Sequence, residues 1–444
     1  MSKKKKNNNA AIMNKEMLAR QRNLYLKRLH AILVGLGKEE VYKMMSQSLK
    51  AALFRMKFRP IKVTVQKEIG RTPLFAKASR HLIMKLYHDQ TVSFENPDYA
   101  IKIGDYNEIF FPFLAIIDDL KESRSYKEVA KIREELADLY SEVTPNGRDA
   151  MNEKVEKVLN QCQLIYSIST CYFERMFFLE EKCLPCEPPE QPCLGIEIQQ
   201  IKPDKRKFLI DGKTRSAYHL GWLYQNVEFG PTSISLGELD PKASIPDLRL
   251  DVYIQRHAIQ RVYERLDCVS LGASQMILCT EIINKPEVIF YKGKTLIAVT
   301  MGKIKFGYLV VTLIDGVVLI KTFLLITSSG TPEGDKLQAL TGLDKSDKSY
   351  LGLDRLSSFY SDDIKSNDKV MRLLDKIGCG RLPDIKNHIP DSGLIKCEQQ
   401  TALMLEKYLK TSDVEKQDWS NLNVEDLTGI LRQESEIMQD ITVE

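Results

Sequence analysis

The sequence predicts a multi-domain α+β protein. An all-α N-terminal domain is expected first, followed by a small domain of two helices and a four-stranded antiparallel meander. Apolar residues recur at helical spacing through most of residues 11–182. Four prolines within residues 183–193 end that pattern. Between residues 248 and 330, short apolar runs alternate with glycine-containing turns. A chain of 444 residues has the length of two or three domains.

The helical domain is expected over residues 11–182. Its first helix should stop at Gly37, and Pro73 suits the first turn of a later helix. Residues 61–65 alternate in the manner of a short strand. The last helix is expected over residues 148–182, where an aromatic stripe indicates a side that faces the core: Tyr166, Tyr172, Phe173, Phe177 and Phe178.

The second domain is expected over residues 248–330. Asp315 and Gly316 separate two apolar runs, and this pair favours the type I′ turn of a β-hairpin. The expected order is a strand at 250–254, helices at 257–266 and 270–283, and strands at 288–291, 295–301, 306–314 and 317–327.

The other segments are interpreted from their composition. Residues 1–10 are interpreted as a disordered basic tail, and residues 411–444 as an acidic tail. Residues 183–247 are interpreted as a proline-rich connector and an irregular region, with short strands near 194–201 and 206–210. Residues 331–410 are interpreted as a mixed helix and loop region.

The net charge of +4 is unevenly distributed. Residues 1–60 hold 15 Lys and Arg against three acidic residues, and residues 411–444 hold two against nine. This uneven distribution of charge is consistent with a nucleic-acid or acidic partner at one end of the chain. It is equally consistent with two chain ends that are simply exposed to solvent. No apolar run reaches the ~20 residues of a membrane span, and the odd number of nine cysteines indicates reduced thiols. We therefore expect a cytoplasmic protein without a membrane partner.

The first candidate site is a row of side chains on one helix. His257, Arg261 and Arg265 are four residues apart, so they share a helical face directly after a strand. Arginine grips phosphate oxygens in a bidentate manner, and histidine can exchange a proton. Lys321 and Thr322 on the last strand could add a phosphate contact and a hydroxyl group.

A structural explanation competes with this one. Arg261 and Arg265 could instead pair with Glu264 or Asp267 on a solvated helix face.

The order of elements resembles that of small bacterial toxin-type RNase domains, the class of RelE-like, colicin-type and barnase-related toxins. The resemblance covers residues 250–327. Its specific parts are VYIQRHAIQRVYERLD at 252–267 and LIKTFLLIT at 319–327. It implies metal-independent RNA cleavage by His257, Arg261, Arg265, Lys321 and Thr322. The long helical N-terminal region has no counterpart in a free-standing toxin.

A cysteine cluster lies at the proposed domain boundary. Cys183, Cys186 and Cys193 provide three thiols within eleven residues, whereas structural zinc prefers four ligands. A zinc site is one interpretation, and incidental cysteines in a linker are the other. No other cofactor is expected.

Two further features have both structural and functional interpretations. The segment 328–334 could bind phosphate at a helix N-terminus, but a helix cap at Thr331 explains it better. Eight basic residues near the N-terminus could follow an RNA backbone or could belong to ordinary amphipathic helices: Arg20, Arg22, Lys27, Arg28, Arg55, Lys57, Arg59 and Lys62.

Together these patterns predict metal-independent RNA cleavage, or RNA binding, by a toxin-like domain of a bacterial defence system or mobile element. The helical domain would regulate it and could recruit a protein partner. One alternative is a non-catalytic interaction or assembly protein of a phage or mobile element. A zinc-stabilised nucleic-acid-binding protein is another.

Overall fold

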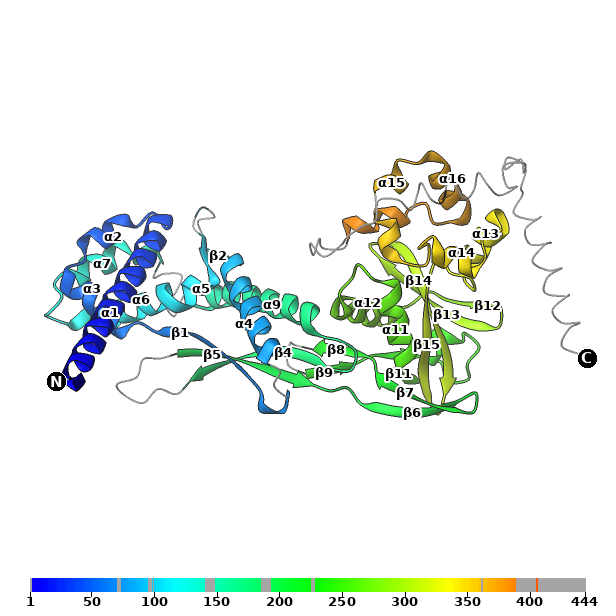
Figure 1. Cartoon of the computed structure of the whole chain (residues 1–444), viewed down its shortest axis with the longest axis horizontal. Helices are drawn as coiled ribbons and strands as arrows, with labels where there is room; N and C mark the ends of the chain where they lie inside the picture. The colour runs from blue at the N-terminus through cyan, green and yellow to red at the C-terminus, as the bar shows by residue number, and fades with distance from the viewer. Residues whose placement is uncertain are drawn as a thin grey trace, which may run out of the picture. The chain divides into compact units, whose positions relative to one another are not determined.

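A computed structural model describes residues 2–69, 73–94, 98, 100–139, 148–184, 193–224, 228–360, 362–388 and 405. The chain divides into two compact units (Figure 1). The first contains Met1–Pro203 and Leu223–Gly230, and the second contains Asp204–Trp222 and Pro231–Glu444. The backbone therefore leaves the first unit, enters the second, returns for a short segment and leaves again.

The first unit is largely helical at its N-terminal end. Its helices are α1 (Ser2–Gly35), α2 (Glu39–Met44), α3 (Gln47–Met56), α4 (Pro73–Asp89), α5 (Ile103–Asp105), α6 (Phe111–Asp119), α7 (Val129–Glu135) and α9 (Arg148–Thr170), with a π-helical turn over Tyr106–Phe110. Helix α1 takes in the basic segment 1–10 from Ser2 onward, which we expected to be disordered.

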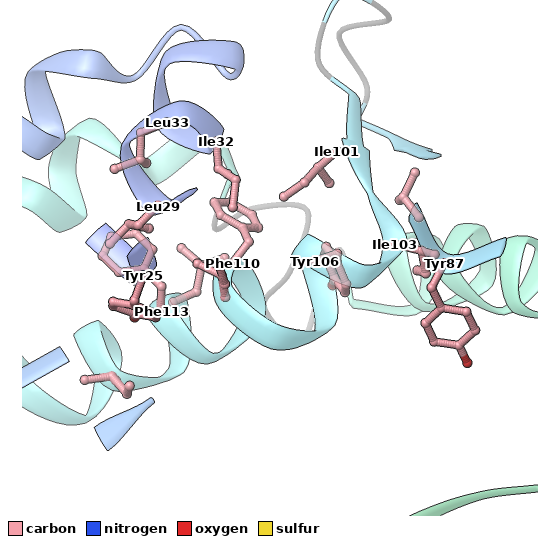
Figure 2. Close-up of a cluster of buried hydrophobic side chains, with 14 of the residues drawn as sticks. Tyr25, Leu29, Ile32, Leu33, Tyr87, Ile101, Ile103, Tyr106, Phe110 and Phe113 are labelled. Carbon is pink, nitrogen blue, oxygen red and sulfur yellow. The ribbon is translucent and has the colours of Figure 1, made fainter. Parts of the chain in front are cut away.

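The core of the first unit forms where α1 meets the segment around α6. Tyr25, Leu29 and Leu33 lie on one side of α1 and face Phe110 and Phe113 (Figure 2). All five side chains are buried. Their helical spacing on α1 explains why the sequence predicted this helix correctly.

The first unit also contains strands, so the expectation of an all-α domain is wrong. Among the described residues, β1 (Arg59–Val65), β5 (Cys193–Ile201) and β4 (Met176–Leu184) form a three-stranded sheet in that order, and β2 (Thr91–Ser93) pairs with β3 (Ala100–Lys102). Helix α9 ends at Thr170, and the aromatic stripe expected on one helix continues into β4. Phe177 and Phe178 are nevertheless buried, as expected of core residues.

The second unit is built on a mixed sheet. In its described part, the strand order is β12-β13-β14-β15-β11-β7-β6, and β10 pairs with β11. The strands are β6 (Lys205–Ile210), β7 (Lys213–His219), β10 (Ser233–Ser235), β11 (Arg249–Gln255), β12 (Val288–Tyr291), β13 (Lys294–Met301), β14 (Ile304–Ile314) and β15 (Val317–Leu325). A hairpin of β8 (Gly221–Tyr224) and β9 (Glu228–Pro231) spans the boundary of the two units in sequence.

The meander β12 to β15 is antiparallel at every step, as expected. Asp315 and Gly316 have φ angles of 49° and 74°, which are the positive values that a type I′ turn requires. The sheet is larger than the expected four-stranded meander, because β6 and β7 from the region 183–247 join it through β11. Strands β5 and β6 coincide with the short strands expected near 194–201 and 206–210, whereas β7 was not expected.

Helices flank this sheet. They are α10 (Leu236–Leu239), α11 (Arg256–Arg265), α12 (Leu271–Ile283), α13 (Pro332–Thr341), α14 (Lys345–Tyr350), α15 (Asp362–Lys365) and α16 (Asp368–Ile377). No helix in the described ranges is long and apolar enough to cross a bilayer. The acidic tail at 411–444 lies outside the described residues.

Candidate functional site

The proposed site in the second unit lies where β11 ends beside β15. The two strands run parallel, with Val252 opposite Val318 and Ile254 opposite Ile320. Helix α11 begins directly after β11 and packs against β15. Helix α11 lies beside β15 (Figure 1). The row that begins at His257 is therefore on a helix that packs against the strand containing Lys321 and Thr322.

A β-bulge shapes β15 at this point. Val311 pairs with Ile320, but the preceding residue Val310 pairs with Thr322, so Lys321 is an extra residue without a partner on β14. A bulge interrupts the alternation of side chains between the two faces of a sheet. Lys321 and Thr322, which lie at this bulge, both line one cavity.

That cavity has a volume of about 950 Å³ and lies wholly within the second unit. All five residues of the predicted catalytic set line it: His257, Arg261, Arg265, Lys321 and Thr322. His257 is exposed, whereas the other four are partly buried. The structure thus brings together side chains from a helix and a strand about 60 residues apart in sequence.

The cavity is rich in cations beyond those that the sequence indicated. Its described lining also includes Arg215, Lys294, Lys345 and Lys348, which gives seven Lys and Arg residues against three Asp residues. A concave surface with this excess concentrates positive potential and attracts anions. No sequence pattern pointed to these four residues, because β7, β13 and α14 reach the cavity through tertiary contacts.

Ion pairs engage both predicted arginines. Arg261 Nη1 lies 2.6 Å from Glu264 Oε2 on the same helix. Arg265 forms a salt bridge with Asp354, and its Nη1 also donates to the main-chain oxygen of Asp354 at 2.9 Å. Both side chains of this second pair are only 12% exposed, so Arg265 has a structural role in holding the loop around Asp354 to α11. The expected pairing with Glu264 occurs for Arg261, whereas Asp267 accepts hydrogen bonds from Ser357.

Lys348 is the most unusual cation of the lining. It is 1% exposed. Its Nζ donates to the main-chain oxygen of Gly334 at 2.6 Å and to Ser329 Oγ at 3.2 Å. Burial lowers the pKa of Lys348 to about 8. Its position in a segment rich in Asp, Lys and Ser gave no sign of this burial.

The loop before α13 caps that helix, as the structural interpretation predicted. Thr331 Oγ1 accepts a hydrogen bond from Gly334 N at 2.9 Å and donates to Ile326 O at 2.6 Å. Ser328 and Ser329, in contrast, line the cavity.

The eight basic residues near the N-terminus belong to the first unit and are not equivalent. Arg28 Nη2 lies 2.5 Å from Asp105 Oδ1 and 3.1 Å from Glu108 Oε2, so its charge is already compensated. Lys57 Nζ lies 4.3 Å from the ring centroid of Phe54. Arg22 is partly buried, and the other five are exposed: Arg20, Lys27, Arg55, Arg59 and Lys62.

The zinc hypothesis falls largely outside the described residues. Cys186 is not described, and neither are the side chains of Cys183 and Cys193, whose backbones lie on β4 and β5. Within the described residues, no group of three or more His, Cys, Asp and Glu side chains could hold a metal ion.

Comparison with known proteins does not assign this site. The chain matches no known family model, no curated protein and no solved structure.

Proposed function

We propose that the cavity of the second unit binds RNA and cleaves it without a metal ion. The observation that carries this proposal is that His257, Lys321 and Thr322 line one cavity in which cations outnumber carboxylates. A polyanion is the ligand class that such a surface favours. An exposed imidazole at its rim supplies the proton exchange that RNA cleavage needs.

The proposed reaction needs no group beyond the chain's own side chains and water. His257 accepts the proton of a ribose 2′-hydroxyl, and the 2′ oxygen attacks the adjacent phosphorus atom. The bond from phosphorus to the 5′ oxygen breaks, and the departing oxygen takes a proton from solvent. The products are a 2′,3′-cyclic phosphate and a 5′-hydroxyl. Lys321 and Lys294 would stabilise the extra negative charge of the transition state.

The arginines have different roles in this proposal from those that the sequence suggested. Arg265 is a positioning residue, since its guanidinium is committed to Asp354. Arg261 is partly exposed and shares its charge with Glu264, so it would contact phosphate at the rim. The basic residues of the first unit would serve partner selection.

The test uses the full chain and a short RNA labelled with a fluorophore and a quencher, in the presence of EDTA. We expect cleavage by the unaltered protein and a rate about 10²–10⁴ lower for His257→Ala. His81→Ala is the matched control, because His81 is an exposed histidine on α4 of the first unit. It should cleave RNA at the unaltered rate.

The same experiment distinguishes catalysis from binding alone. Lys321→Ala should weaken RNA binding and lower the dependence of log K on log salt by about one. Cleavage that survives in His257→Ala would contradict the catalytic proposal. Absent cleavage, with RNA binding that weakens in Lys321→Ala, would favour a non-catalytic RNA-binding protein, which the engagement of both arginines also fits.

A further inference from the structure

A serine and a lysine from different segments meet in the wall of the cavity. Ser329 follows β15, and Lys348 belongs to α14. Lys348 Nζ lies 3.2 Å from Ser329 Oγ, and both residues line the cavity. Ser329 is partly buried, whereas Lys348 is 1% exposed. A molecule that enters the cavity would therefore meet the hydroxyl before the amine.

The surroundings of Lys348 favour a neutral amine. Its two described hydrogen-bond partners are uncharged: the main-chain oxygen of Gly334 at 2.6 Å and the hydroxyl of Ser329. Burial has the largest effect on the pKa of Lys348 and lowers it to about 8, although the negative charges of Asp335 and Asp344 act in the opposite direction. About one amine in ten is then unprotonated at pH 7, compared with fewer than about one in a thousand at the ordinary pKa of lysine.

An unprotonated Lys348 can act as a base towards Ser329. A neutral amine has two hydrogens and one lone pair. One hydrogen can remain on the oxygen of Gly334, and the lone pair can accept a hydrogen bond from Ser329 Oγ. Direct proton transfer needs about 2.6–3.2 Å between the two heavy atoms, and this pair is 3.2 Å apart. Serine becomes a strong nucleophile when an adjacent base removes its proton, and Ser–Lys pairs are one known form of this arrangement.

Hydrogen bonds fix the turn that follows Ser329. Gly330 has a φ angle of 91°, in the left-handed region, and its N–H donates to Asp335 Oδ1 at 2.8 Å. Asp335 is itself held by Lys292, whose Nζ lies 2.9 Å from Asp335 Oδ2. Because the next residue is fixed in this way, the backbone of Ser329 is held in place before any substrate arrives, which lowers the entropic cost of a reaction.

A positive charge lies beside the same turn. A Cβ atom built on Gly330 would lie 3.9 Å from Lys294 Nζ, so this ammonium group is close to the residue that follows Ser329. Lys294 is exposed and lines the cavity, as does Lys345 on α14. Cations near a serine nucleophile attract negatively charged substrates and stabilise the oxyanion that forms when the hydroxyl attacks a carbonyl group.

We propose that Ser329 is the nucleophile and Lys348 the general base of a site that hydrolyses carboxylic esters with a negative charge. Lys348 Nζ accepts the proton of the Ser329 hydroxyl, and Oγ attacks the carbonyl carbon of the ester. The bond between that carbon and the ester oxygen breaks, and the departing alcohol takes the proton from Lys348. Water then attacks the acyl-serine, again with Lys348 as the base, which releases the carboxylic acid and restores the hydroxyl.

This activity is separate from the proposed cleavage of RNA, although the two share one cavity. His257 takes no part in it, and the bond that breaks is an ester of carbon and not of phosphorus. The competing explanation is structural: Lys348 would only hold the loop 329–334 against α14. That role predicts an ordinary, unreactive hydroxyl at Ser329.

The first test treats the full chain with a fluorophosphonate probe, which bonds to activated serine hydroxyls with loss of fluoride. We expect the label on Ser329, located by peptide mass spectrometry, at a rate that rises as the pH increases through about 8. Ser329→Ala and Lys348→Met should each lower the labelling rate at least about 10²-fold. Ser349→Ala is the matched control and should be labelled at the unaltered rate, because Ser349 is an exposed serine on α14 outside the described cavity lining.

The pH profile of the unaltered protein tests the base without any variant, so it holds even if Lys348→Met fails to fold. A labelling rate that does not change between pH 6 and pH 10 would overturn the role of Lys348. A label at other residues in place of Ser329, or labelling that persists in Ser329→Ala, would overturn the whole site.

The second test identifies the substrate class. It follows release of 4-nitrophenol from 4-nitrophenyl succinate, which carries a free carboxylate, and from the neutral ester 4-nitrophenyl butyrate. We expect kcat/KM to be about tenfold or more higher for the anionic ester, and Lys294→Met should reduce this preference. Equal or faster hydrolysis of the neutral ester would overturn the assignment of an anionic substrate. Neither test contains RNA, so failure here and failure of the proposed RNA cleavage are observed independently.

Discussion

Removal of one partner from the salt bridge between Arg265 and Asp354 should strongly destabilise the second unit. The salt bridge joins the last turn of α11 to the loop after α14, and both side chains are 12% exposed. Replacement of Arg265 by Met leaves the carboxylate of Asp354 buried without its counter-charge, which costs about 3–5 kcal/mol. Each kcal/mol lowers the melting temperature of a unit of this size by about 2–4 °C. The expected loss is therefore about 6–20 °C.

The assay is differential scanning calorimetry of the full chain, with Asp354→Leu and the double variant Arg265→Met, Asp354→Leu for comparison. The double variant should recover most of the loss, because two apolar side chains of similar volume need no counter-charge. A melting temperature of Arg265→Met within about 2 °C of the unaltered protein would refute this reasoning. A double variant as unstable as the single ones would show that packing, and not charge, governs the site.

Two further predictions concern the neighbouring loop and helices. Burial lowers the pKa of Lys348 to about 8, so below pH 8 the folded state contains a buried, protonated amine that lowers its stability by up to roughly 3 kcal/mol. This destabilisation disappears as the pH rises towards 10.5. Lys348→Met should therefore stabilise the protein most at low pH. Urea titrations between pH 7 and 11 should show a flatter profile for the variant, and parallel profiles would contradict the assignment. Thr331→Ala removes the cap of α13 and should cost about 1–2 kcal/mol in the same assay; an unchanged midpoint would mean that the cap contributes nothing.

The local parts of the fold were the most predictable from sequence. The hairpin at Asp315 and Gly316 and the limits of β12 follow from turn chemistry and apolar runs, which are properties of adjacent residues. The break after Thr170 was missed because the aromatic residues that follow fit a helix and a strand equally well. Strand β6 coincides with the short strand expected near residues 206–210, whereas β7 was missed. One pairing partner of β7, strand β11, lies more than 30 residues away in sequence.

The candidate site was predictable to a smaller extent. The spacing of His257, Arg261 and Arg265 indicated a shared helical face, and all three line the cavity. Whether an arginine is free or paired depends on tertiary neighbours, and Asp354 lies 89 residues from Arg265. The burial of Lys348 has the same origin, because Gly334 and Ser329 reach it from a different segment.

The exchange of segments between the two units has a consequence for how the chain can be divided. A fragment that starts near residue 248 retains β11 and the meander but lacks β7, which pairs with Tyr253, Ile254 and Gln255. Their backbone groups would become a bare strand edge, and such edges promote association of copies. During synthesis, in contrast, β7 is made before β11, so this edge can be covered while β15 is still inside the ribosome. The segment before residue 222 would thus protect a sheet that is completed about 100 residues later.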